Sequence, residues 1–440
     1  MPFRLLFIFF LTLSTSLPVS AAIVDIVNQD GINYILYDDM SAKVRDAPSF
    51  SGNCVVRESI SYGNRTYTVT SILSKAFSGC RGLVSLTIPN TVSSIGDEAF
   101  YGCSVLAAVT LGDHVAIIGR EAFRGCSVLT SVTIPNSVTT IGNGAFYGCA
   151  RLSQVTIPNS VTVIGDDVFH GCSGLTTVTI PSSVTSIGNS AFDGCSGLTT
   201  VTIPGSVTSI GDWSFFGCAG LTSVTIPDSV FSIGSWAFNQ CVGLTSVKIG
   251  DSVAFIGSWA FQGCTGLTTL TIPNSVTLIG DYAFADCSGL TTTTIGDSVI
   301  SIGDWSFSGC DGLTSVTIGS SVVTIGELSF RGSVNIKKLY CKCEIPPSVS
   351  DDCFSLENYV NATLFVPVES VESYRSVDPW SKFNTIKEFD PAGVEDIVGA
   401  VDEQHAVGYY NTQGIKAAEP WPGLNIVVYS DGSTRKMLGR

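Results

Sequence analysis

The chain has 440 residues, which at about 150 residues per domain is long enough for two or three domains. Charged residues are only 13% and hydrophobic residues 45%, a composition that argues against a disordered charged tail and a coiled coil. The 22 basic residues stand against 37 acidic ones, a formal charge of −15. This balance argues against nucleic-acid binding and against docking on anionic lipid through a basic patch.

Residues 1–22 have the three regions of a secretory signal peptide. Arg4 precedes the apolar run 5–13, and Pro18 and the small residues 20–22 follow it. The apolar run is too short to span a bilayer, although an uncleaved anchor is the alternative interpretation. No later stretch has the length and hydrophobicity of a membrane span. We therefore expect a mature chain without an integral membrane segment, secreted or attached to the outer surface.

Residues 23–67 carry short β-patterned segments at 32–37, 54–60 and 67–69, and a Gly63-Asn64 turn precedes the last of them. They lead into a strictly periodic region. A repeat array needs a terminal cap to cover its first repeat. We therefore expect residues 23–67 to form a β-rich N-terminal cap.

Residues 68–340 contain a repeat of 23 residues. Cysteine occupies one position of it in Cys80, Cys103, Cys126, Cys149, Cys172, Cys195, Cys218, Cys241, Cys264, Cys287 and Cys310. Phenylalanine occupies another in Phe77, Phe100, Phe123, Phe146, Phe169, Phe192, Phe215, Phe238, Phe261, Phe284, Phe307 and Phe330. A fixed period of this length predicts a solenoid, here of about 12 coils, whose stacked turns bury the repeated apolar residues.

One repeat shows how each coil is built. Val178 and Ile180 alternate with threonines, which predicts a strand that ends at Pro181. A second short extended segment ends at Gly188, and a turn or 3₁₀ piece follows it. Phe192, within that turn, is expected to point into the core. The strands of successive coils should therefore stack in parallel.

The cysteine column has two sharper interpretations and a plain one. Metal sites need paired spacings such as C-x₂-C, which the column lacks, and disulfides between coils would consume an even number of cysteines. Side chains stacked in register also point alongside each other, which suits bridging poorly. We therefore favour buried thiols that act as small hydrophobic groups. Outside the column, Cys343 and Cys353 are a candidate disulfide, and Cys341 with Cys343 is a weaker candidate for a zinc pair.

These repeats resemble the BspA-like leucine-rich repeats. The matching pattern is Cys-Ser-Gly-Leu-Thr-Thr-Val-Thr-Ile-Pro at 195–204, preceded by Ile-Gly-Asn-Ser-Ala-Phe at 187–192. The resemblance implies a β-rich α+β leucine-rich-repeat solenoid without enzymatic activity. It also implies binding of an extracellular protein or glycan, often in adhesion. The family has no shared binding residues to transfer to this chain.

The last hundred residues depart from the period. Residues 341–389 resemble the divergent last repeats of the family and should form a terminal cap, and 390–403 should be a linker. Residues 404–440 alternate apolar residues with Gly and Asp-Gly turns, which predicts a small β unit. Its Tyr-Asn-x-x-Gly at 410–414 and Gly-Leu-x-Ile at 423–426 resemble the sorting domain of Bacteroidetes type IX (Por) secretion. That resemblance implies secretion machinery as a partner; a plain β tail packed on the solenoid is the alternative.

Two residues before each phenylalanine, the repeat varies in a way that points to a binding surface. Five consecutive coils carry Trp213, Trp236, Trp259, Tyr282 and Trp305, where earlier coils have Glu, Gly, Asp or Ser. A stripe of aromatic rings could stack on sugars or offer an apolar patch to a protein. The competing interpretation is that the rings only cover the edge of the coils.

Two further surface features are weaker candidates. The strands expose a ladder of threonines from Thr133 to Thr317, interrupted by Lys248, which is either a binding face or a solvated β surface. Asp-Ser-Val recurs with Ser229, Ser252 and Ser298, and this resembles a Bacteroidetes O-glycosylation pattern. Its alternative is a turn in which Asp replaces Asn.

The sequence offers little for an enzyme. Glycoside hydrolysis needs two carboxylates across a cleft, whereas the adjacent pairs 166–167 and 351–352 should diverge. No G-x-S-x-G motif with histidine partners and no phosphate-binding loop occurs. We therefore expect no catalytic residues, no metal and no cofactor. A structural spacer without a specific ligand remains the main alternative to a binding protein.

Overall fold

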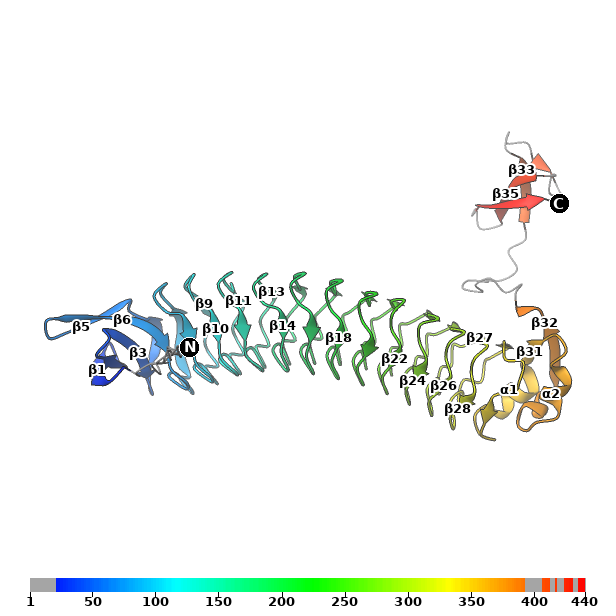
Figure 1. Cartoon of the computed structure of the whole chain (residues 1–440), viewed down its shortest axis with the longest axis horizontal. Helices are drawn as coiled ribbons and strands as arrows, with labels where there is room; N and C mark the ends of the chain where they lie inside the picture. Colours follow the sequence, from blue (N-terminus) through cyan, green and yellow to red (C-terminus); the bar gives the residue numbers. More distant parts are fainter. Residues whose placement is uncertain (1–20, 392–405, 412–415, 418–422, 430–433, 440) are drawn as a thin grey trace, which may run out of the picture. The chain divides into compact units, whose positions relative to one another are not determined.

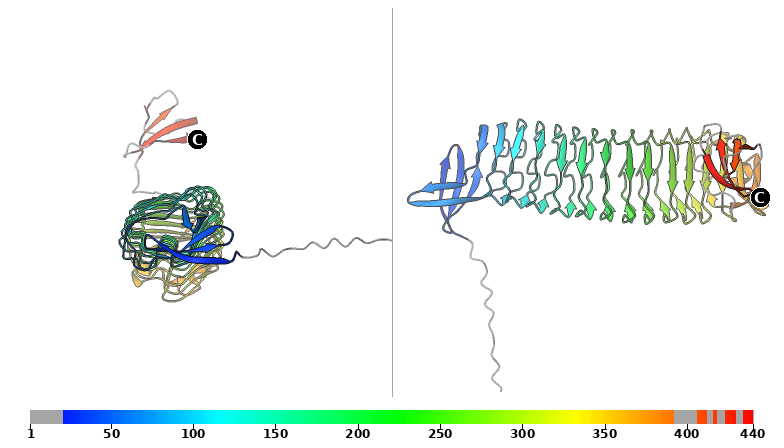
Figure 2. Two further views of the ribbon diagram at one scale, coloured as in Figure 1. Left: turned by 90° about the vertical axis from the view of Figure 1, so that its left-hand side faces the viewer. Right: turned by 90° about the horizontal axis from the view of Figure 1, so that it is seen from above.

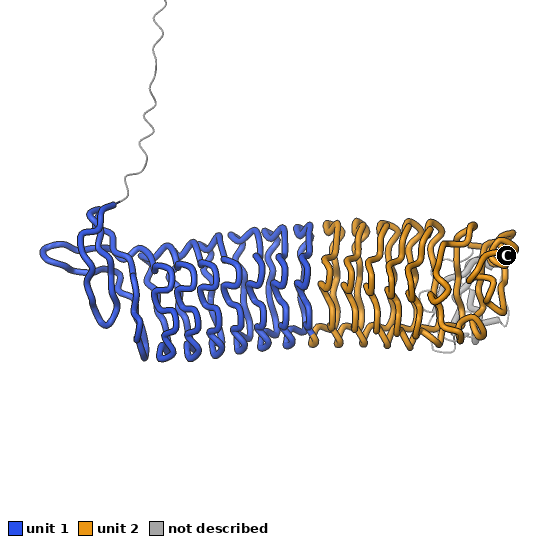
Figure 3. The backbone as a smooth tube through the Cα atoms, turned by 90° about the horizontal axis from the view of Figure 1, so that it is seen from below, with its two compact units in different colours: residues 1–218 blue, residues 219–440 orange. Residues whose placement is uncertain are grey.

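The computed structural model describes residues 21–391, 406–411, 416–417, 423–429 and 434–439. The chain divides into two compact units, Met1–Cys218 and Ala219–Arg440 (Figure 3). Nearly all of the predicted signal peptide lies outside the described residues, as does most of the predicted linker. None of the helices in the described part of the chain is long and apolar enough to cross a membrane.

Each repeat forms one turn with two strands. The first strand carries the Val-Thr-Ile pattern and ends at a Pro or Gly turn, and the second strand is only two residues long and ends at a glycine (Figure 1). Strands of successive turns pair in parallel with residue offsets of 23, as in Thr177 with Thr200 and Ser186 with Ser209.

The first unit begins with strands β1 (Ile23–Gln29), β2 (Ile32–Tyr37) and β3 (Ser41–Asp46), which pair antiparallel. Strand β3 then pairs in parallel with β6 (Arg65–Ile72), which forms a hairpin with β5 (Ser59–Tyr62). First strands are β4 (Ser51–Val55), β7 (Gly82–Thr87), β9 (Ala108–Thr110), β11 (Ser131–Val132), β13 (Gln154–Thr156), β15 (Thr177–Thr179) and β17 (Thr200–Val201). Second strands are β8 (Ser94–Ile95), β10 (Ile117–Ile118), β12 (Thr140–Ile141), β14 (Val163–Ile164), β16 (Ser186–Ile187) and β18 (Ser209–Ile210).

The second unit continues the same pattern of turns (Figure 2). Its first strands are β19 (Ser223–Thr225), β21 (Ser246–Lys248), β23 (Thr269–Ile272), β25 (Thr292–Ile295), β27 (Ser315–Ile318), β29 (Lys338–Cys341), β31 (Thr363–Pro367) and β32 (Thr385–Phe389). Its second strands are β20 (Ser232–Ile233), β22 (Phe255–Ile256), β24 (Leu278–Ile279), β26 (Ser301–Ile302), β28 (Thr324–Ile325) and β30 (Ser348–Val349). The C-terminal strands β33 (Ala406–Asn411), β34 (Lys416–Ala417), β35 (Gly423–Tyr429) and β36 (Thr434–Gly439) form a four-stranded antiparallel sheet.

Helix is scarce among the described residues. The helices are α1 (Leu356–Asn361), α2 (Val371–Arg375) and the 3₁₀ helix η1 (Trp380–Lys382), all in the last turns. Here the aromatic residues Trp380, Phe383 and Tyr359 surround Phe354 with centroid separations of 5.4 to 6.0 Å. This aromatic cluster closes the end of the core where no further repeat follows.

A ladder of phenylalanine rings forms the centre of each unit. All twelve predicted phenylalanines are fully buried. Successive rings lie near-parallel, for example Phe146 and Phe169 with centroids 5.7 Å apart and Phe261 and Phe284 with centroids 5.3 Å apart. Two phenylalanines outside the repeat pattern extend the column beyond its first and last members. Phe50 meets Phe77 edge-on, and Phe354 stacks on Phe330. Stacking the turns therefore buries what one turn alone could not.

The predicted fold class is confirmed: the chain is a solenoid of stacked parallel strands, with about 15 turns of about 23 residues. The structure has more turns than the 12 coils expected, because segments that lack the repeated Phe and Cys also fold as turns of the solenoid. Strand β4 pairs in parallel with β7 at one end, and β31 pairs with β29 and β32 at the other. Backbone pairing thus extends the solenoid beyond the region where the side-chain pattern is strict.

The cysteine column is buried and its thiols are free. Most of the Sγ atoms donate to the carbonyl of the phenylalanine in the previous turn, as Cys103 does to Phe77 at 3.2 Å and Cys287 to Phe261 at 3.3 Å, whereas Cys80 donates to the Ala47 carbonyl at 3.0 Å. Ser333 takes the same place and donates its hydroxyl to Phe307 at 2.8 Å. These thiols therefore serve as small buried groups that also satisfy a carbonyl.

The predicted disulfide between Cys343 and Cys353 is not present, since both residues are free and buried. The Cys343 thiol donates to the carbonyls of Gly319 and Val322, beside the turn that follows the first strand. Cys353 instead lies beside Phe330, whose N–H its carbonyl accepts. The two thiols thus belong to different corners of the turn.

Candidate ligand-binding surface

The column predicted as a binding surface has an unusual backbone. All eleven residues at this position, from Glu98 to Leu328, have a positive φ between 51° and 65°, the left-handed region. Most of their N–H groups donate to a carbonyl of the next turn, as Trp259 does to Asp281 at 2.8 Å. The left-handed conformation costs a non-glycine residue about 1–2 kcal/mol. Only one turn uses the residue best suited to it, Gly144.

In the second unit this column becomes a stack of aromatic rings. The centroids of Trp236 and Trp259 are 4.8 Å apart, those of Trp259 and Tyr282 5.1 Å, and those of Tyr282 and Trp305 5.6 Å. The interplanar angles are 9° or less. All four residues are half-buried. The predicted stripe is thus one continuous ladder within this unit.

Trp213 belongs to the first unit and is more exposed than the four rings of the ladder. It is 36% exposed, and its ring is tilted by 50° against Phe216 at a centroid separation of 4.9 Å. Its φ of 60° matches that of the other aromatic members.

The stacking determines which parts of the rings a ligand can reach. Trp259 and Tyr282 each lie between two near-parallel neighbouring rings, at centroid separations of 4.8 to 5.6 Å. The solvent therefore meets ring edges along the middle of the ladder. A sugar that binds by lying flat on an aromatic face would not find an open face along the middle of the ladder.

Three carboxylate side chains lie next to the aromatic column in the sequence. Asp281, Asp304 and Glu327 each lie one residue before the column and are exposed. The Oδ1 atom of Asp281 accepts the N–H of Asp304 at 2.9 Å, and that of Asp304 accepts the N–H of Glu327 at 2.7 Å. Because each Asp uses one oxygen for the next turn, its carboxylate is held in register beside the aromatic rings.

A second group of apolar residues lies at the second strands of the same unit, and the sequence interpretation missed it. Five consecutive turns expose a large apolar residue at one of two adjacent positions: Phe231 (58%), Phe255 (40%), Leu278 (42%), Ile300 (53%) and Val323 (59%). The Phe231 and Phe255 rings meet edge-to-face at 5.3 Å. We call these five residues the second-strand apolar group.

In the first unit the same two positions are mostly Ser or Thr, with Ile117 and Val163 exposed in separate turns. The signal was therefore present in the sequence as a change of residue type from one half of the repeats to the other. It was hidden because the apolar residue shifts by one position between turns.

The threonine ladder is only in part a solvent-exposed face. Thr133, Thr156, Thr179, Thr202, Thr225, Lys248 and Thr271 are exposed. Thr294 is half-buried and Thr317 is buried. Tyr340 pairs with Thr317 on the next strand and stacks on Phe365 at 4.6 Å. Aromatic residues of the last turns thus occupy the end of this face.

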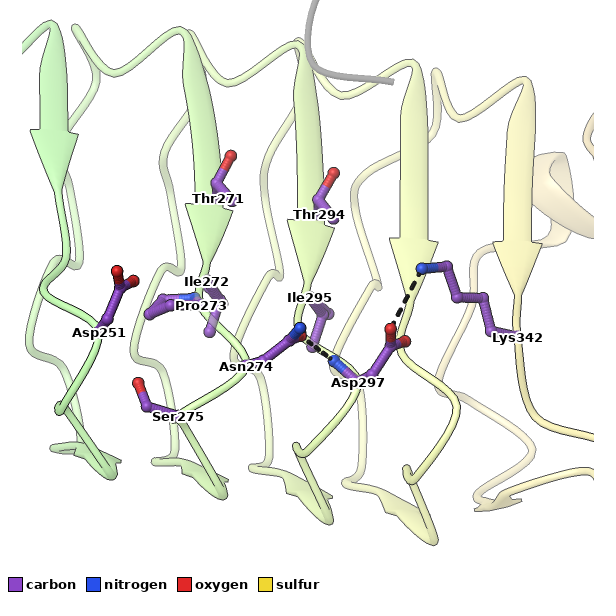
Figure 4. A pocket seen from close by; sticks show the side chains of 11 residues that line it. Asp251, Thr271, Ile272, Pro273, Asn274, Ser275, Thr294, Ile295, Asp297 and Lys342 are labelled. Carbon is purple, nitrogen blue, oxygen red and sulfur yellow. Dashed lines mark hydrogen bonds and ion pairs between the residues drawn. The ribbon is translucent and has the colours of Figure 1, made fainter. Parts of the chain in front are cut away.

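A cavity of about 480 Å³ lies in the second unit where β23 and β25 end. It is lined by Asp251, Thr271, Ile272, Pro273, Asn274, Ser275, Thr294, Ile295, Gly296, Asp297 and Lys342. Figure 4 shows Lys342 reaching toward Asp297, with Nζ 3.4 Å from Oδ2, and Asn274 Oδ1 accepting the Asp297 N–H at 2.7 Å. The buried Ser275 hydroxyl has no hydrogen-bond partner among the described residues.

Turn geometry accounts for this cavity. Residues that follow a glycine turn donate their N–H to the previous turn, as Asp251 does to Asp228 and Asp297 to Asn274. A Cβ at Gly296 would lie 2.5 Å from the Pro273 carbonyl oxygen, so glycine permits this close approach. Pro273 cannot approach the turn of Asp251 in the same way, and Asn274 makes no such bond among the described contacts. A gap remains between these turns.

The three serines predicted as O-glycosylation sites differ in exposure. Ser252 and Ser298 are exposed and Ser229 is half-buried. In the first unit the equivalent serines donate to carbonyls of the previous turn, as Ser183 does to Val161 at 2.7 Å. O-glycosylation stays a prediction. Within the described residues, no group of three or more His, Cys, Asp or Glu side chains is arranged to hold a metal ion.

Comparison with known proteins identifies the repeats. A family model described as BspA type leucine rich repeat region (6 copies) matches residues 49–176, 168–291 and 278–375. None of the curated proteins matches the chain.

Solved structures show the same fold. A leucine-rich repeat protein from Bacteroides ovatus is 27% identical, with a TM-score of 0.53 over 83% of this chain and 100% of that one. The pneumococcal vaccine antigen PcpA is 18% identical, with a TM-score of 0.50 over 84% of this chain and 99% of that one. A leucine rich cell surface protein from Faecalibacterium prausnitzii is 30% identical, with a TM-score of 0.43 over 66% of this chain and 94% of that one.

Proposed function

Because the chain belongs to the BspA-type leucine-rich repeat family, we propose that it is a non-enzymatic binding protein of the cell surface or the extracellular space. Its repeats build a surface of stacked side chains on which a ligand can be recognised. The similar protein from Faecalibacterium prausnitzii is described as a cell surface protein, which agrees with this role. We propose adhesion or ligand recognition as the activity.

One observation carries the proposal: large aromatic residues occupy a strained backbone position in consecutive turns. Glycine, serine and aspartate fill the same position elsewhere, so the fold does not require an aromatic residue there. A bulky side chain with a positive φ is uncommon and costs free energy. Retaining such residues in register, partly exposed, is consistent with selection for a contact outside the fold.

Two other functions fit the chain less well. The carboxylate pairs that an enzyme would need make structural contacts: Asp166 Oδ1 accepts the Asn189 N–H, and Asp351 pairs with Lys382 at 2.8 Å. A structural spacer needs only a uniform polar surface. The aromatic ladder of the second unit is not such a surface.

Export is part of the proposal. It is supported by the signal-peptide pattern of residues 1–22 and by the resemblance of residues 404–440 to a type IX sorting domain. Deleting residues 404–440 and following the chain in the producing bacterium tests the second point. We expect the shortened chain to remain in the periplasm, and its unchanged arrival at the surface would contradict a sorting role.

Binding is tested with wild-type protein and the variant Trp236→Ser/Trp259→Ser on arrays of glycans and extracellular-matrix proteins. Serine occurs naturally in the column at Ser190, so the backbone position accepts it. We expect the variant to keep its circular dichroism spectrum and lose the wild-type array signals. Glu98→Ser, at the same backbone position in the first unit, is the matched control and should bind as wild type. A folded variant that still binds, or one that unfolds, would contradict the assignment.

A further inference from the structure

We propose that the ligand of this surface is a protein whose contact area is apolar at its centre and basic at its border. This inference rests on the proposed function and names the class of partner. The surface lies within residues 231–328 of the second unit. It combines the ladder Trp236–Trp305 with the second-strand apolar group.

The first argument is the extent of the apolar surface. In each of the four turns that carry a ladder residue, an exposed apolar residue precedes that residue by four or five positions, as Ile300 precedes Trp305. The five residues of the second-strand apolar group are 40% to 59% exposed and lie in consecutive turns. Apolar residues scattered singly over a surface would not recur in this way. Large apolar residues exposed in turn after turn are typical of sites of protein contact. The first unit, built from the same repeat, lacks this pattern.

The second argument is the orientation of the rings. Sugars bind aromatic residues chiefly over the ring face, and the faces of Trp259 and Tyr282 are stacked on their neighbours. The adjoining residues Leu278, Ile300 and Val323 are aliphatic and offer no hydrogen bonds to hydroxyl groups. Ring edges beside aliphatic side chains suit an apolar protein surface better than a glycan.

The third argument is charge. Asp281, Asp304 and Glu327 are exposed along the ladder, and no ion pair is found for them among the described residues. The whole chain has a formal charge of −15. Interfaces place opposite potentials against each other, which steers the encounter and selects the partner. These three carboxylates form the acidic border of the surface. A partner with lysine or arginine around its apolar contact would complement this border.

The experiment uses the full chain and three short peptides of defined chemistry. One alternates leucine with lysine, one alternates leucine with glutamate, and one alternates serine with lysine. We expect the leucine–lysine peptide to bind at least about tenfold more tightly than either of the others. Its affinity should fall as NaCl rises from about 50 to about 500 mM, because the charged border is screened. Equal binding of the leucine–glutamate or serine–lysine peptide would overturn the proposal.

A charge-matched variant separates this surface from general attraction to an acidic protein. Phe255→Ser/Leu278→Thr/Ile300→Thr/Val323→Thr introduces residue types that the first unit carries at the same positions. Its affinity for the leucine–lysine peptide should fall about tenfold at unchanged net charge. A folded variant that binds the peptide as wild type does would place binding elsewhere and overturn the proposal.

The border is tested with Asp281→Asn/Asp304→Asn. Asparagine can still accept the N–H of the next turn, as Asn189 does from Asp212 at 2.9 Å, so the turn is preserved. We expect weaker peptide binding and a shallower dependence on NaCl. If the arrays instead show a glycan that depends on Trp236 and Trp259, the proposed function stands and this inference fails. If no ligand depends on either group, both fail.

Discussion

The thiol of Cys172 donates a hydrogen bond to the carbonyl of Phe146 in the previous turn, with Sγ 3.3 Å from the oxygen. Ser333 makes the same contact with Phe307 through its hydroxyl. Hydrogen bonds of this kind thus join most of the cysteine column to the phenylalanine column. A small side chain with one donor meets the requirement of this position, and the larger apolar residues cannot.

The buried thiols predict a loss of stability in alkaline solution. Burial raises the pKa of Cys103 and of Cys172 to about 12, from an ordinary value of 9.0. Above about pH 9 the unfolded chain therefore releases thiol protons that the folded chain keeps, so the free energy of unfolding falls as pH rises toward 12. Each such thiol contributes a slope of about 1.4 kcal/mol per pH unit. Thermal melting between neutral pH and pH 10.5 measures the slope.

Cys172→Ser is the control for that experiment. Serine does not ionise in this range and can keep the hydrogen bond, as Ser333 does. The variant should fold and show a stability slope smaller by about one proton above pH 9. An unchanged slope would mean that the cysteine column does not govern alkaline unfolding.

Removing one ring from the phenylalanine ladder should be costly. Phe169 is fully buried and stacks on Phe146 and Phe192 at 5.7 and 5.5 Å. Phe169→Ala should therefore lower the free energy of unfolding by about 3–5 kcal/mol. Urea unfolding followed by circular dichroism measures the change. Thr179→Ser, on an exposed position of the same region, should change it by less than about 0.5 kcal/mol; a similar loss in both variants would contradict the argument.

The left-handed column predicts a stabilising substitution. Ser190 has a φ of 51°, and Gly144 occupies the same position two turns earlier. Ser190→Gly removes about 1–2 kcal/mol of backbone strain but adds about 0.5–1 kcal/mol of chain entropy in the unfolded state, so we expect a net gain of up to about 1.5 kcal/mol. Ser190→Val should destabilise the fold instead. Melting temperatures that rank valine above glycine would show that this position is not strained.

The glycine turns predict a contrast between two glycine substitutions. A Cβ at Gly296 would lie 2.5 Å from a backbone oxygen, whereas one at Gly205 meets no heavy atom within 4 Å. Gly296→Ala should cost about 1–3 kcal/mol because backbone atoms must move. Gly205→Ala should be neutral or stabilise by about 0.4–1 kcal/mol. Chemical denaturation of the two variants side by side gives the comparison, and equal effects would refute the close-approach explanation.

The period of 23 residues was sufficient to predict the solenoid and its core. A column of identical apolar residues such as Phe77 to Phe330 can be buried only if the turns stack in register, so the pattern dictates the contacts. Free, buried cysteines were expected for the same reason. Phe354 escaped prediction because the spacing changes after Phe330, although its ring continues the ladder.

The candidate surface depended more on the tertiary structure. The sequence marked the positions of Trp236, Trp259, Tyr282 and Trp305, because a change of residue type along a column is visible without coordinates. The separation and angle of successive turns decided which parts of the rings remain open. Neighbouring rings cover the ring faces in the middle of the ladder and leave the ring edges open. The exposure of Phe231 and Ile300 beside them, and the separation of Cys343 from Cys353, were likewise decided by packing. A repeat specifies which side chains recur, whereas their exposure depends on atoms contributed by neighbouring turns.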